Sequence, residues 1–359
     1  MRTGETFSHY SVGPQIGQGG FGKIFAARDT NTGLLYALKN ESTTAERKTL
    51  KFETEVLRRI QNYPAFPFLF DNGEDNHIYW SLIELCGPSL ASILKKIPNH
   101  IFSFSTGIRA SMQILSALRD LHSCGFLHRD IKPSNVLVRI TKDKPPLCLI
   151  DFGLARVYRD QTTNRHIPPR KTAGFRGTKT YASLRSHQNQ DLSRRDDLIS
   201  WFYFTIDIIT GLLPWKNSKE DVIKLKSEWD VDSAVAPISH RLKEIWDHIN
   251  SLGFEDDPNY AQYAEILNEI CKEAHIREID PYDWEPYVQE YSTRLASEFG
   301  VALRIDSGGS VQSFRSELGL PPTIYNQMGI TQSLLPPQKP MGHMELSELN
   351  ERDHPSCCC

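Results

Sequence analysis

The chain has 359 residues, of which 39% are hydrophobic and 24% are charged, and its formal net charge is −3. This composition excludes a wholly disordered chain, and the small net charge excludes a general attraction to nucleic acid or anionic membranes. The length exceeds what one compact core usually holds, so we expect two lobes. The cysteines form no CxxC pair, which indicates neither a zinc site nor a disulfide framework and favours a reducing, intracellular compartment.

No stretch of the sequence is typical of a signal peptide or a membrane span. Residues 1–13 lack an apolar segment, which a signal peptide requires. The most apolar stretch, residues 198–213, contains Asp207 and precedes Pro214. It is shorter than the ~20 residues that a spanning helix needs, so we expect a helix buried at the centre of a lobe.

The first ninety residues are predicted to form strands and one helix. Residues 9–29 and 34–40 are β-type runs, separated by the turn-forming stretch DTNTG. Residues 44–62 have the pattern of a helix, and residues 76–85 have the pattern of another strand. This part of the chain is therefore expected to be mostly sheet with one helix.

The pattern changes to helices at Ser105. Apolar residues recur at three- and four-residue spacing from there to Gly125, and residues 240–254 and 260–276 are similarly amphipathic. Residues 305–359 are rich in Gly, Pro, Ser and Gln and show no sustained periodicity. We expect this last part to be a disordered tail.

The stretch IGQGGFGKI contains Gly17, Gly19 and Gly22 in the spacing GxGxxG. Three glycines this close are also typical of a plain flexible hairpin. A dinucleotide-binding fold would need a helix directly after them, whereas the residues that follow have a strand pattern. A glycine hairpin between two strands lets backbone N–H groups approach phosphate oxygens, so these residues are a candidate phosphate lid.

Lys39 lies in an apolar strand segment and would need an anionic partner if it is buried. At ~100° per residue, Glu53 falls within the apolar stripe of the predicted helix, whereas Glu55 points away from it. Glu46 shares the stripe, but its place in the first helical turn explains it through the helix dipole. A Lys39–Glu53 pair accounts for both charges, and the alternative is a strand-end lysine whose ammonium reaches solvent.

The stretch LHRDIKPSNVL carries Asp130, Lys132 and Asn135, and the stretch LCLIDFG carries Asp151. Two strands joined by a short connection would form a hairpin that brings the three acidic and amide side chains to one end. Phosphoryl transfer needs oxygen ligands for Mg²⁺, a carboxylate that accepts the hydroxyl proton, and a cation on the transferred group. A charged surface loop explains any one of these residues, but not the whole set.

These motifs resemble those of eukaryotic protein kinases. The usual Ala-Pro-Glu is absent, and the stretches YAS and RRDDL in its place resemble the casein kinase 1 superfamily. The stretches AGFRGT, GLLPWKN and YDWE are similar to the tau-tubulin kinase branch, and ELCGPSL resembles casein kinase 1 proper. Over residues 5–295, the resemblance implies the α+β, two-lobed protein kinase fold. A small β-rich N-lobe with one helix is expected at about residues 5–86, and a larger, mostly α-helical C-lobe at about 87–295.

The resemblance implies that ATP is bound between the lobes. Lys39, held by Glu53, would bind the α- and β-phosphates, and Ile83 would be the gatekeeper behind the adenine. The backbones of Glu84 and Cys86 would bond the adenine edge. The implied nucleotide-binding residues are Ile16, Gly17, Gly19, Gly22, Ile24, Ala37, Lys39, Glu53, Ile83, Glu84 and Cys86.

The same resemblance assigns the catalytic and metal roles. Asp130 would be the catalytic base, and Lys132 would contact the γ-phosphate. Asn135 and Asp151 would hold Mg²⁺, so the implied cofactors are ATP and Mg²⁺.

Three further residues are implied to support the catalytic loop. Asp197 would cap the start of the buried helix and brace the loop around His128 and Arg129. A plain N-cap or first-turn acid is the alternative for Asp197, and the two roles are compatible.

The chain departs from the family pattern at a basic site for a phosphate already present on the substrate. Relatives often carry an Arg immediately before the Tyr of YAS, where this chain has Thr180. Arg176, Lys179 and Lys226 are candidates to supply the charge instead. The alternative is that they are ordinary surface basic residues.

The chain ends in Cys357, Cys358 and Cys359. A prenylation motif needs its Cys fourth from the end, where Ser356 lies. Terminal Cys clusters in some casein kinase 1 relatives are palmitoylated, and two or three acyl chains anchor a protein firmly. Lipidation and unmodified exposed thiols both stay open, as do membrane association through this cluster and a nuclear location beside the expected cytoplasmic one.

We expect an active, non-specific serine/threonine protein kinase, and the alternative is a pseudokinase scaffold. No essential polar residue is missing from the motifs, and Lys132 two residues after Asp130 is the form found in Ser/Thr kinases. The expected partners are proteins with Ser or Thr acceptors, acidic or primed ones included. Nucleic acid is not an expected partner, and the chain is expected to be a monomer.

Overall fold

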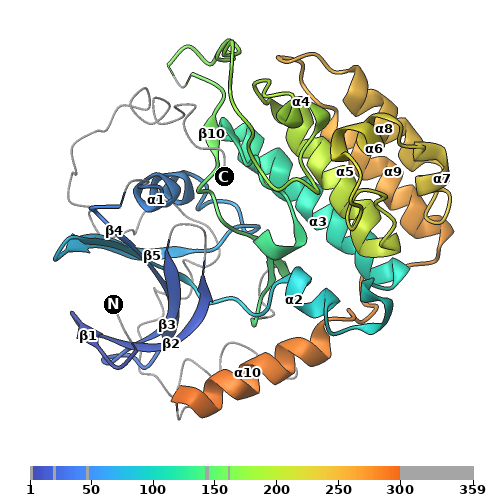
Figure 1. Ribbon diagram of the computed structural model, residues 1–359. Helices are drawn as coiled ribbons and strands as arrows, with labels where there is room; N and C mark the ends of the chain where they lie inside the picture. The colour runs from blue at the N-terminus through green and yellow to red at the C-terminus, as the bar shows by residue number, and fades with distance from the viewer. Residues whose placement is uncertain (1–2, 19–21, 46–47, 142–144, 161, 300–359) are drawn as a thin grey trace.

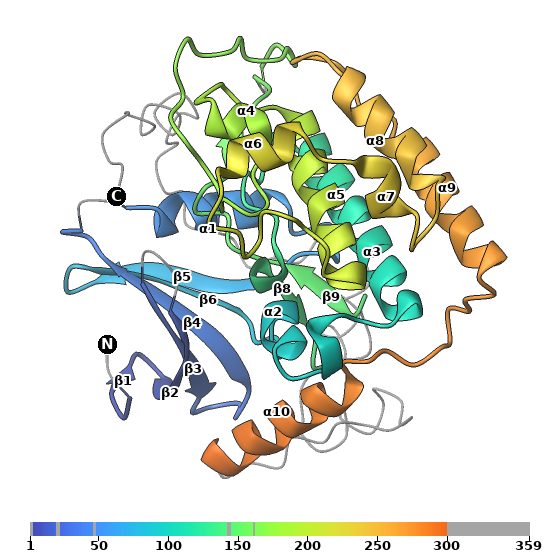
Figure 2. The same ribbon diagram turned by 45° about the vertical axis from the view of Figure 1, so that its right-hand side comes forward.

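The computed structural model describes residues 3–18, 22–45, 48–141, 145–160 and 162–299. Figures 1 and 2 show a sheet with one helix on one side of the molecule and a larger group of helices on the other. The predicted α+β architecture with two lobes is confirmed. The 305–359 tail, including its terminal cysteines, lies outside the described residues.

The smaller lobe is an antiparallel sheet with the strand order β1-β2-β3-β4-β6-β5. One face of the sheet packs a small apolar cluster that includes Val12, Phe25 and Leu38. The strand β5 was not predicted, because most of its side chains are at least partly exposed and no apolar alternation marks it. The strands are β1 (Thr6–Phe7), β2 (Tyr10–Gln18), β3 (Lys23–Asp29), β4 (Leu35–Ser42), β5 (Leu69–Asp75) and β6 (Ile78–Glu84).

The helix α1 (Leu50–Arg59) is shorter than the predicted 44–62. The Glu41 carboxylate at the end of β4 accepts the backbone N–H groups of Thr49 and Leu50, at 3.0 and 3.1 Å. A carboxylate at a helix N-terminus satisfies free N–H groups and complements the dipole, so the helix begins there. Glu46 lies outside the described residues.

The larger lobe is built around α3 (Phe104–Ser123) and α5 (Arg194–Thr210), which contact each other along their length. The Ser103 hydroxyl accepts the Thr106 N–H, so α3 begins one residue before the predicted Ser105. The helix α5 is buried on almost every side, as its apolar composition predicts, and ends at Gly211 with a φ of 70°. The other helices of this lobe are α2 (Leu90–Leu94), α4 (Leu184–His187), α6 (Val222–Ser227), α7 (Val231–Val235), α8 (Leu242–Ser251) and α9 (Tyr260–Glu273).

No helix among the described residues is both long enough and apolar enough to cross a bilayer.

Four short strands lie next to the junction of the lobes. The strands β8 (Val136–Val138) and β9 (Leu147–Leu149) pair antiparallel, which confirms the predicted hairpin. The strands β7 (Phe126–Leu127) and β10 (Arg156–Val157) form a second antiparallel pair. These two pairs fix the chain segments that carry the DIKPSN and DFG motifs.

The helix α10 (Glu285–Phe299) was not predicted and runs past residue 295. In Figures 1 and 2 it extends from the helical lobe to the sheet lobe. Trp284, just before it, packs edge-on against Phe102 of the helical lobe. At its other end, the Phe299 ring lies where a Cβ on Gly13 of β2 would stand, so this helix contacts both lobes.

Candidate active site

Lys39 and Glu53 form the buried ion pair that the sequence predicts. The Lys39 Nζ donates to Glu53 Oε2 at 2.5 Å, and both side chains are almost fully buried. Lys39 comes from the central strand β4, and Glu53 comes from the apolar face of α1. Glu55 is half exposed and pairs with Arg58 and Arg59 on the outer face, as its helical position requires.

A second carboxylate approaches the same lysine. Asp151 Oδ1 lies 3.8 Å from the Lys39 Nζ, which places the DFG motif beside β4. Burial lowers the pKa of Lys39, but the Glu53 and Asp151 carboxylates together raise it above its usual value. Burial likewise raises the pKa of Asp151, and the Lys39 ammonium brings it below its usual value. Both groups are therefore charged at neutral pH.

Asp130 is held in place by three neighbours. Its Oδ2 lies 2.7 Å from the Lys132 Nζ, and its Oδ1 accepts the Thr178 hydroxyl at 2.8 Å. The Asn135 amide donates to the Asp130 carbonyl at 2.9 Å. The Lys132 Nζ also donates to Thr178 Oγ1 at 2.8 Å, which closes a small polar network around the carboxylate. Such a network fixes the orientation of Asp130.

Thr178 was not singled out in the sequence, although the stretch RGTK contains it. It reaches Asp130 because the preceding residue is Gly177, with a φ of 95°. A Cβ on Gly177 would lie 2.7 Å from the Arg129 carbonyl oxygen, so only glycine permits this approach. A glycine before a hydroxyl residue is too common a pattern to have identified the contact from the sequence.

Asn135 and Asp151 lie at the same end of the β8–β9 hairpin. The Ile150 N–H donates to the Asn135 carbonyl at 2.9 Å, which ties the two segments together. The Asn135 side-chain NH₂ is used on Asp130, so its side-chain oxygen is the atom left to accept. The Asp151 side chain is 31% exposed, so a ligand in solvent can reach it. Two oxygen donors of this kind fit Mg²⁺ completed by phosphate and water oxygens.

The described residues contain no cluster of three or more His, Cys, Asp or Glu side chains that could hold a metal by itself.

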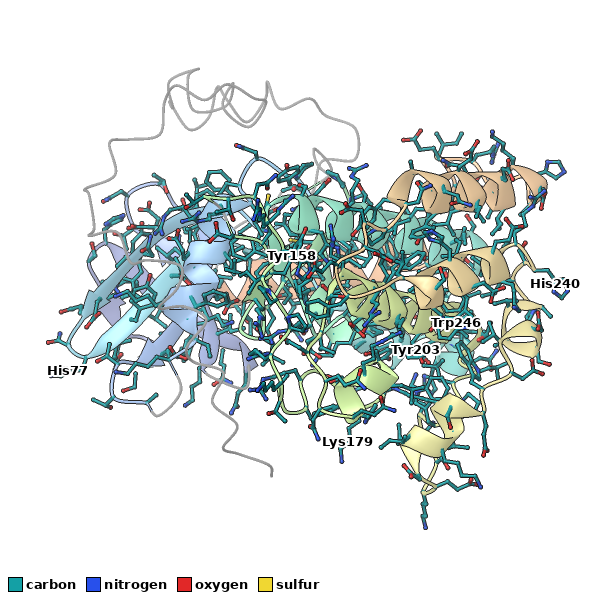
Figure 3. The ribbon with its side chains drawn as sticks, turned by 90° about the horizontal axis from the view of Figure 1, so that it is seen from above. His77, Tyr158, Lys179, Tyr203, His240 and Trp246 are labelled. Atoms are coloured by element: carbon teal, nitrogen blue, oxygen red, sulfur yellow. The ribbon has the colours of Figure 1, made fainter. Side chains whose placement is uncertain are left out.

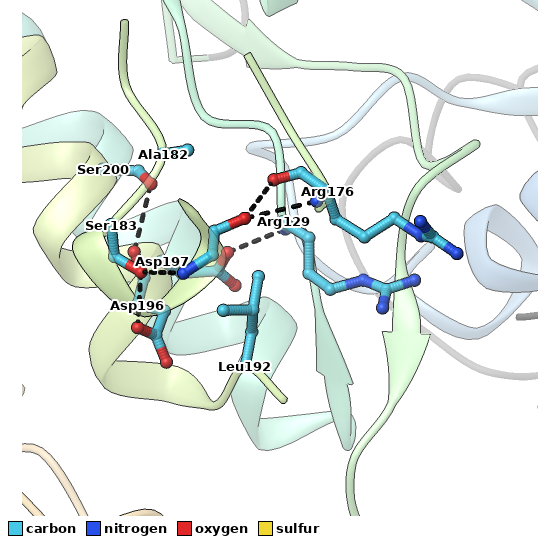
Figure 4. Close-up of a pocket in the computed structure, with 9 residues that line it drawn as sticks. Arg129, Arg176, Ala182, Ser183, Leu192, Asp196, Asp197 and Ser200 are labelled. Carbon is cyan, nitrogen blue, oxygen red and sulfur yellow. Dashed lines mark hydrogen bonds between the residues drawn. The ribbon is translucent and has the colours of Figure 1, made fainter. Parts of the chain in front are cut away.

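Asp197 braces the catalytic loop as predicted. Its carboxylate accepts the backbone N–H groups of His128 and Arg129, at 2.8 and 2.7 Å. Arg129 has a φ of 66°, a left-handed conformation that costs energy for a side chain of this size. Figure 4 shows Asp197 bonded to Arg129 beside Asp196, and Asp196 is the residue that accepts the Ser193 N–H at the start of α5. The predicted capping role therefore belongs to Asp196.

Two residues behind this brace were missed in the sequence. The His122 Nε2–H donates to Asp197 Oδ2 at 2.8 Å, and the Tyr260 hydroxyl donates to His122 Nδ1 at 2.5 Å. Burial lowers the pKa of His122, which keeps the imidazole neutral. Burial raises the pKa of Asp197, but the hydrogen bond from His122 brings it below its usual value. Tyr260 and His122 come from α9 and α3, so no local pattern indicates that they meet.

The glycine hairpin is described in part. Gly17 pairs with Ile24 across β2 and β3, and Gly19 lies outside the described residues. A Cβ on Gly22 would lie 2.2 Å from the Asn40 carbonyl oxygen, so glycine is required there. Ala37 pairs with Ile83 between β4 and β6, and half-buried Ile16 lies next to Gly17. Ile24 also pairs with Lys39 between β3 and β4, so Ile24, Ala37, Lys39 and Ile83 share one face of the sheet.

The segment that joins the lobes includes a backbone amide, that of Cys86, which could meet a ligand. The Cys86 N–H forms no hydrogen bond with any other residue that the structure describes. The Glu84 side chain is turned to Arg139, whose Nε donates to it at 2.8 Å. The Cys86 thiol is buried beside Cys148, and their hydrogen bond raises the pKa of Cys86 well above its usual value. This environment favours an unreactive thiol and an available backbone amide.

The three candidates for a substrate-phosphate site differ in how far they are exposed. Arg176 is half exposed, lies next to Arg129 in Figure 4 and lines a small cavity with it. Lys179 is exposed and points outward in Figure 3. Lys226 is only 4% exposed, and its Nζ donates to the backbone carbonyls of Lys179 and Ala182. Lys226 is therefore not part of the surface set that the sequence predicted.

The chain matches the family model for the protein kinase domain over residues 10–275. It is 33% identical to a "probable serine/threonine-protein kinase" of Dictyostelium discoideum over 279 residues, which are 77% of this chain and 56% of that protein. It is 30% identical to the serine/threonine-protein kinase spe-6 of Caenorhabditis elegans over 280 residues, 75% of this chain and 74% of that protein. The chain thus spans about half the length of the first relative. The fold, the HRD and DFG motifs, the match to the family model and these relatives together show that this chain belongs to the eukaryotic protein kinase family.

Proposed function

We propose that this protein transfers the γ-phosphoryl group of ATP to Ser or Thr hydroxyls of proteins, as a casein kinase 1-like enzyme. The observation that carries the proposal is the network around Asp130, in which Lys132, Asn135 and Thr178 orient one carboxylate. The two relatives are named serine/threonine-protein kinases. The complete ion-pair and metal-ligand set weighs against a pseudokinase scaffold, since a scaffold has no need of it.

The nucleotide would be bound by groups from both lobes. Lys39 would bind the α- and β-phosphates, and the Cys86 amide and Glu84 carbonyl would bond the adenine edge. Asn135 and Asp151 would hold Mg²⁺, which when bound supplies positive charge to the phosphate oxygens. The Lys39–Glu53 pair supports this role, because Glu53 keeps the ammonium charged and fixed at the cleft.

In the proposed reaction, Asp130 receives the hydrogen bond of the acceptor hydroxyl and aims its oxygen at the γ-phosphorus. The new O–P bond forms as the bond from phosphorus to the bridging oxygen breaks, and ADP leaves. The hydroxyl proton passes to the Asp130 carboxylate. Lys132, which lies beside Asp130, would neutralise charge on the transferred group.

The proposed substrates are proteins with acidic or previously phosphorylated segments. Arg176 is half exposed and Lys179 is exposed, and both can meet an anion. Thr180 in place of the Arg of many relatives weakens this basic surface. We therefore propose a tolerance for primed substrates rather than a requirement for them.

Transfer of labelled phosphate from ATP to casein tests the proposed activity. We expect Asp130→Asn to lower kcat by about 10³-fold, because the carboxylate that accepts the proton is lost. Asp232→Asn on the exposed surface of α7 is the matched control and should retain full activity. Equal incorporation by the wild type and Asp130→Asn would refute the assignment and favour the scaffold.

A further inference from the structure

Lys226 holds the chain segment of residues 179–187 from inside the helical lobe. It projects from α6, and its Nζ donates to the Lys179 carbonyl at 2.9 Å and to the Ala182 carbonyl at 2.5 Å. His187 Nε2 lies 3.4 Å from the same nitrogen. One ammonium thus contacts three positions of the segment between residues 179 and 187.

The surroundings of Lys226 differ from those of an ordinary salt-bridged lysine. Its Nζ lies 4.9 Å from the Tyr203 ring centre and 5.2 Å from that of Trp215. None of the described carboxylates forms an ion pair with it. Burial lowers its pKa to about 7, while carbonyl oxygens and aromatic faces favour the charged form. Because only 4% of the Lys226 surface is exposed, a phosphate in solvent has little access to this nitrogen.

Thr180 and Tyr181, which lie between the two residues that Lys226 contacts, are also held by hydrogen bonds. The Trp215 Nε1–H donates to the Thr180 carbonyl at 2.7 Å, and the Tyr181 hydroxyl donates to Asp207 Oδ2 at 2.6 Å. Figure 3 places Tyr203 inside the lobe and Lys179 at its outer edge, so the segment lies between the aromatic core and solvent. Backbone carbonyls of three of its residues are thus fixed by side chains from helices and loops of the C-lobe.

This anchored segment begins one residue after Thr178. The Thr178 hydroxyl contacts both Asp130 and Lys132, so a shift of the segment would move a group that touches the catalytic carboxylate. Displaced backbone here would also change the surface that faces a bound protein substrate. The nucleotide contacts of β4 and α1 lie on other elements and would not be altered.

We propose that Lys226 is a positioning residue that fixes residues 178–182 in the form that accepts a protein substrate. This inference rests on the proposed kinase function. In this role the Lys226 side chain binds backbone carbonyls of the enzyme rather than a phosphate on the substrate. Its loss should therefore weaken the use of protein substrates, with or without a priming phosphate, and leave the affinity for ATP unchanged.

Steady-state kinetics of Lys226→Met on the full chain test the proposal. We expect the KM for an acceptor peptide to rise about 10-fold, since two hydrogen bonds are lost. The KM for ATP should stay within about twofold of the wild type. Lys224→Met removes an exposed lysine of the same helix and should leave both values unchanged.

Two peptides that differ only in a priming phosphoserine separate the proposed role from direct phosphate binding. We expect Lys226→Met to leave the ratio of their kcat/KM values unchanged. The proposal would be overturned if kcat/KM for the primed peptide, divided by that for the unprimed peptide, fell in Lys226→Met but not in Lys224→Met. It would also be overturned if the KM for ATP rose as much as the KM for the acceptor peptide. Should Lys226→Met fail to fold, Lys226→Gln serves the same comparison with a polar side chain.

Hydrogen exchange of the backbone amides supplies a readout that needs no catalysis. Amides of residues 179–187 should exchange about tenfold faster in Lys226→Met than in the wild type or in Lys224→Met. Faster exchange in Lys226→Met, together with a wild type that has no kinase activity, would refute the proposed function but support the positioning role of Lys226. If exchange in Lys226→Met equals that of an active wild type, the positioning role of Lys226 is refuted and the proposed kinase function is not.

Discussion

Lys39 and Lys226 are both buried, with 7% and 4% of their surface exposed, yet they are stabilised in opposite ways. Two carboxylates face Lys39 and raise its pKa. Lys226 is surrounded by carbonyl oxygens and aromatic rings, and burial lowers its pKa to about 7. One lysine lies at the proposed nucleotide site, and the other lies behind the proposed substrate site.

The difference shows that the partners of a buried lysine, rather than its burial, indicate its role. A lysine with carboxylate partners keeps a fixed positive charge, which phosphate oxygens can use. A lysine that donates to backbone carbonyls uses its hydrogen bonds to hold the chain. Three predictions test this contrast, beginning with the largest expected effect.

Lys39→Met should reduce kcat/KM for phosphoryl transfer by about 10²–10³-fold, because it removes a charged group from the phosphates. The free energy of unfolding should also fall, by about 3 kcal/mol, because the Glu53 carboxylate stays buried without its ammonium partner. Steady-state kinetics and thermal unfolding measure the two effects, with Lys51→Met on the exposed side of α1 as the control. Full activity in Lys39→Met would remove the basis for its proposed role.

Glu53→Gln should lower kcat/KM by about 10-fold, because Lys39 keeps a carboxylate, Asp151, at 3.8 Å. The unfolding free energy should fall by about 3 kcal/mol, since breaking a buried ion pair leaves an incompletely compensated charge. Denaturant unfolding measures the loss. Glu55→Gln breaks only exposed pairs and should change stability by less than about 1 kcal/mol, and similar losses in the two variants would contradict the contrast.

The pH dependence of stability should reveal the unusual lysine. Lys226 has a pKa of about 7 in the folded chain and 10.5 as the ordinary value, so the unfolded chain binds more protons between these pH values. Unfolding free energy therefore rises with pH in this window, by about 1 kcal/mol per unit. Between pH 7 and 9, the unfolding free energy of the wild type should therefore rise by about 2 kcal/mol relative to that of Lys226→Met, and parallel curves would show that Lys226 stays charged.

The residues whose positions the sequence predicted are those carried by short, unusual motifs. Asp130, Asn135 and Asp151 were expected at one end of a hairpin, and the β8–β9 pairing places them there. Helical periodicity placed Glu53 on the apolar face of its helix, where it could meet Lys39. The Lys39 Nζ and Glu53 Oε2 lie 2.5 Å apart. In each case, the local pattern of the chain fixes the direction in which the side chain points.

Other residues of the site could not be found in this way. His122 and Tyr260 meet Asp197 only because α3, α5 and α9 pack together. Thr178 reaches Asp130 only because Gly177 allows the backbone to approach Arg129. Each is a common residue type in an ordinary helix or loop, so its surroundings, and not its neighbours in sequence, decide its part.

The sequence by itself determined the lobes, the buried α5 and the polar residues that surround the cleft, because periodicity and motif spacing depend on local geometry. Only the tertiary structure decided where α1 begins, that α10 contacts both lobes, and that Lys226 points inward. The physical reason is the same in each case. These features depend on contacts between segments distant in the chain, whose free energy no local pattern records.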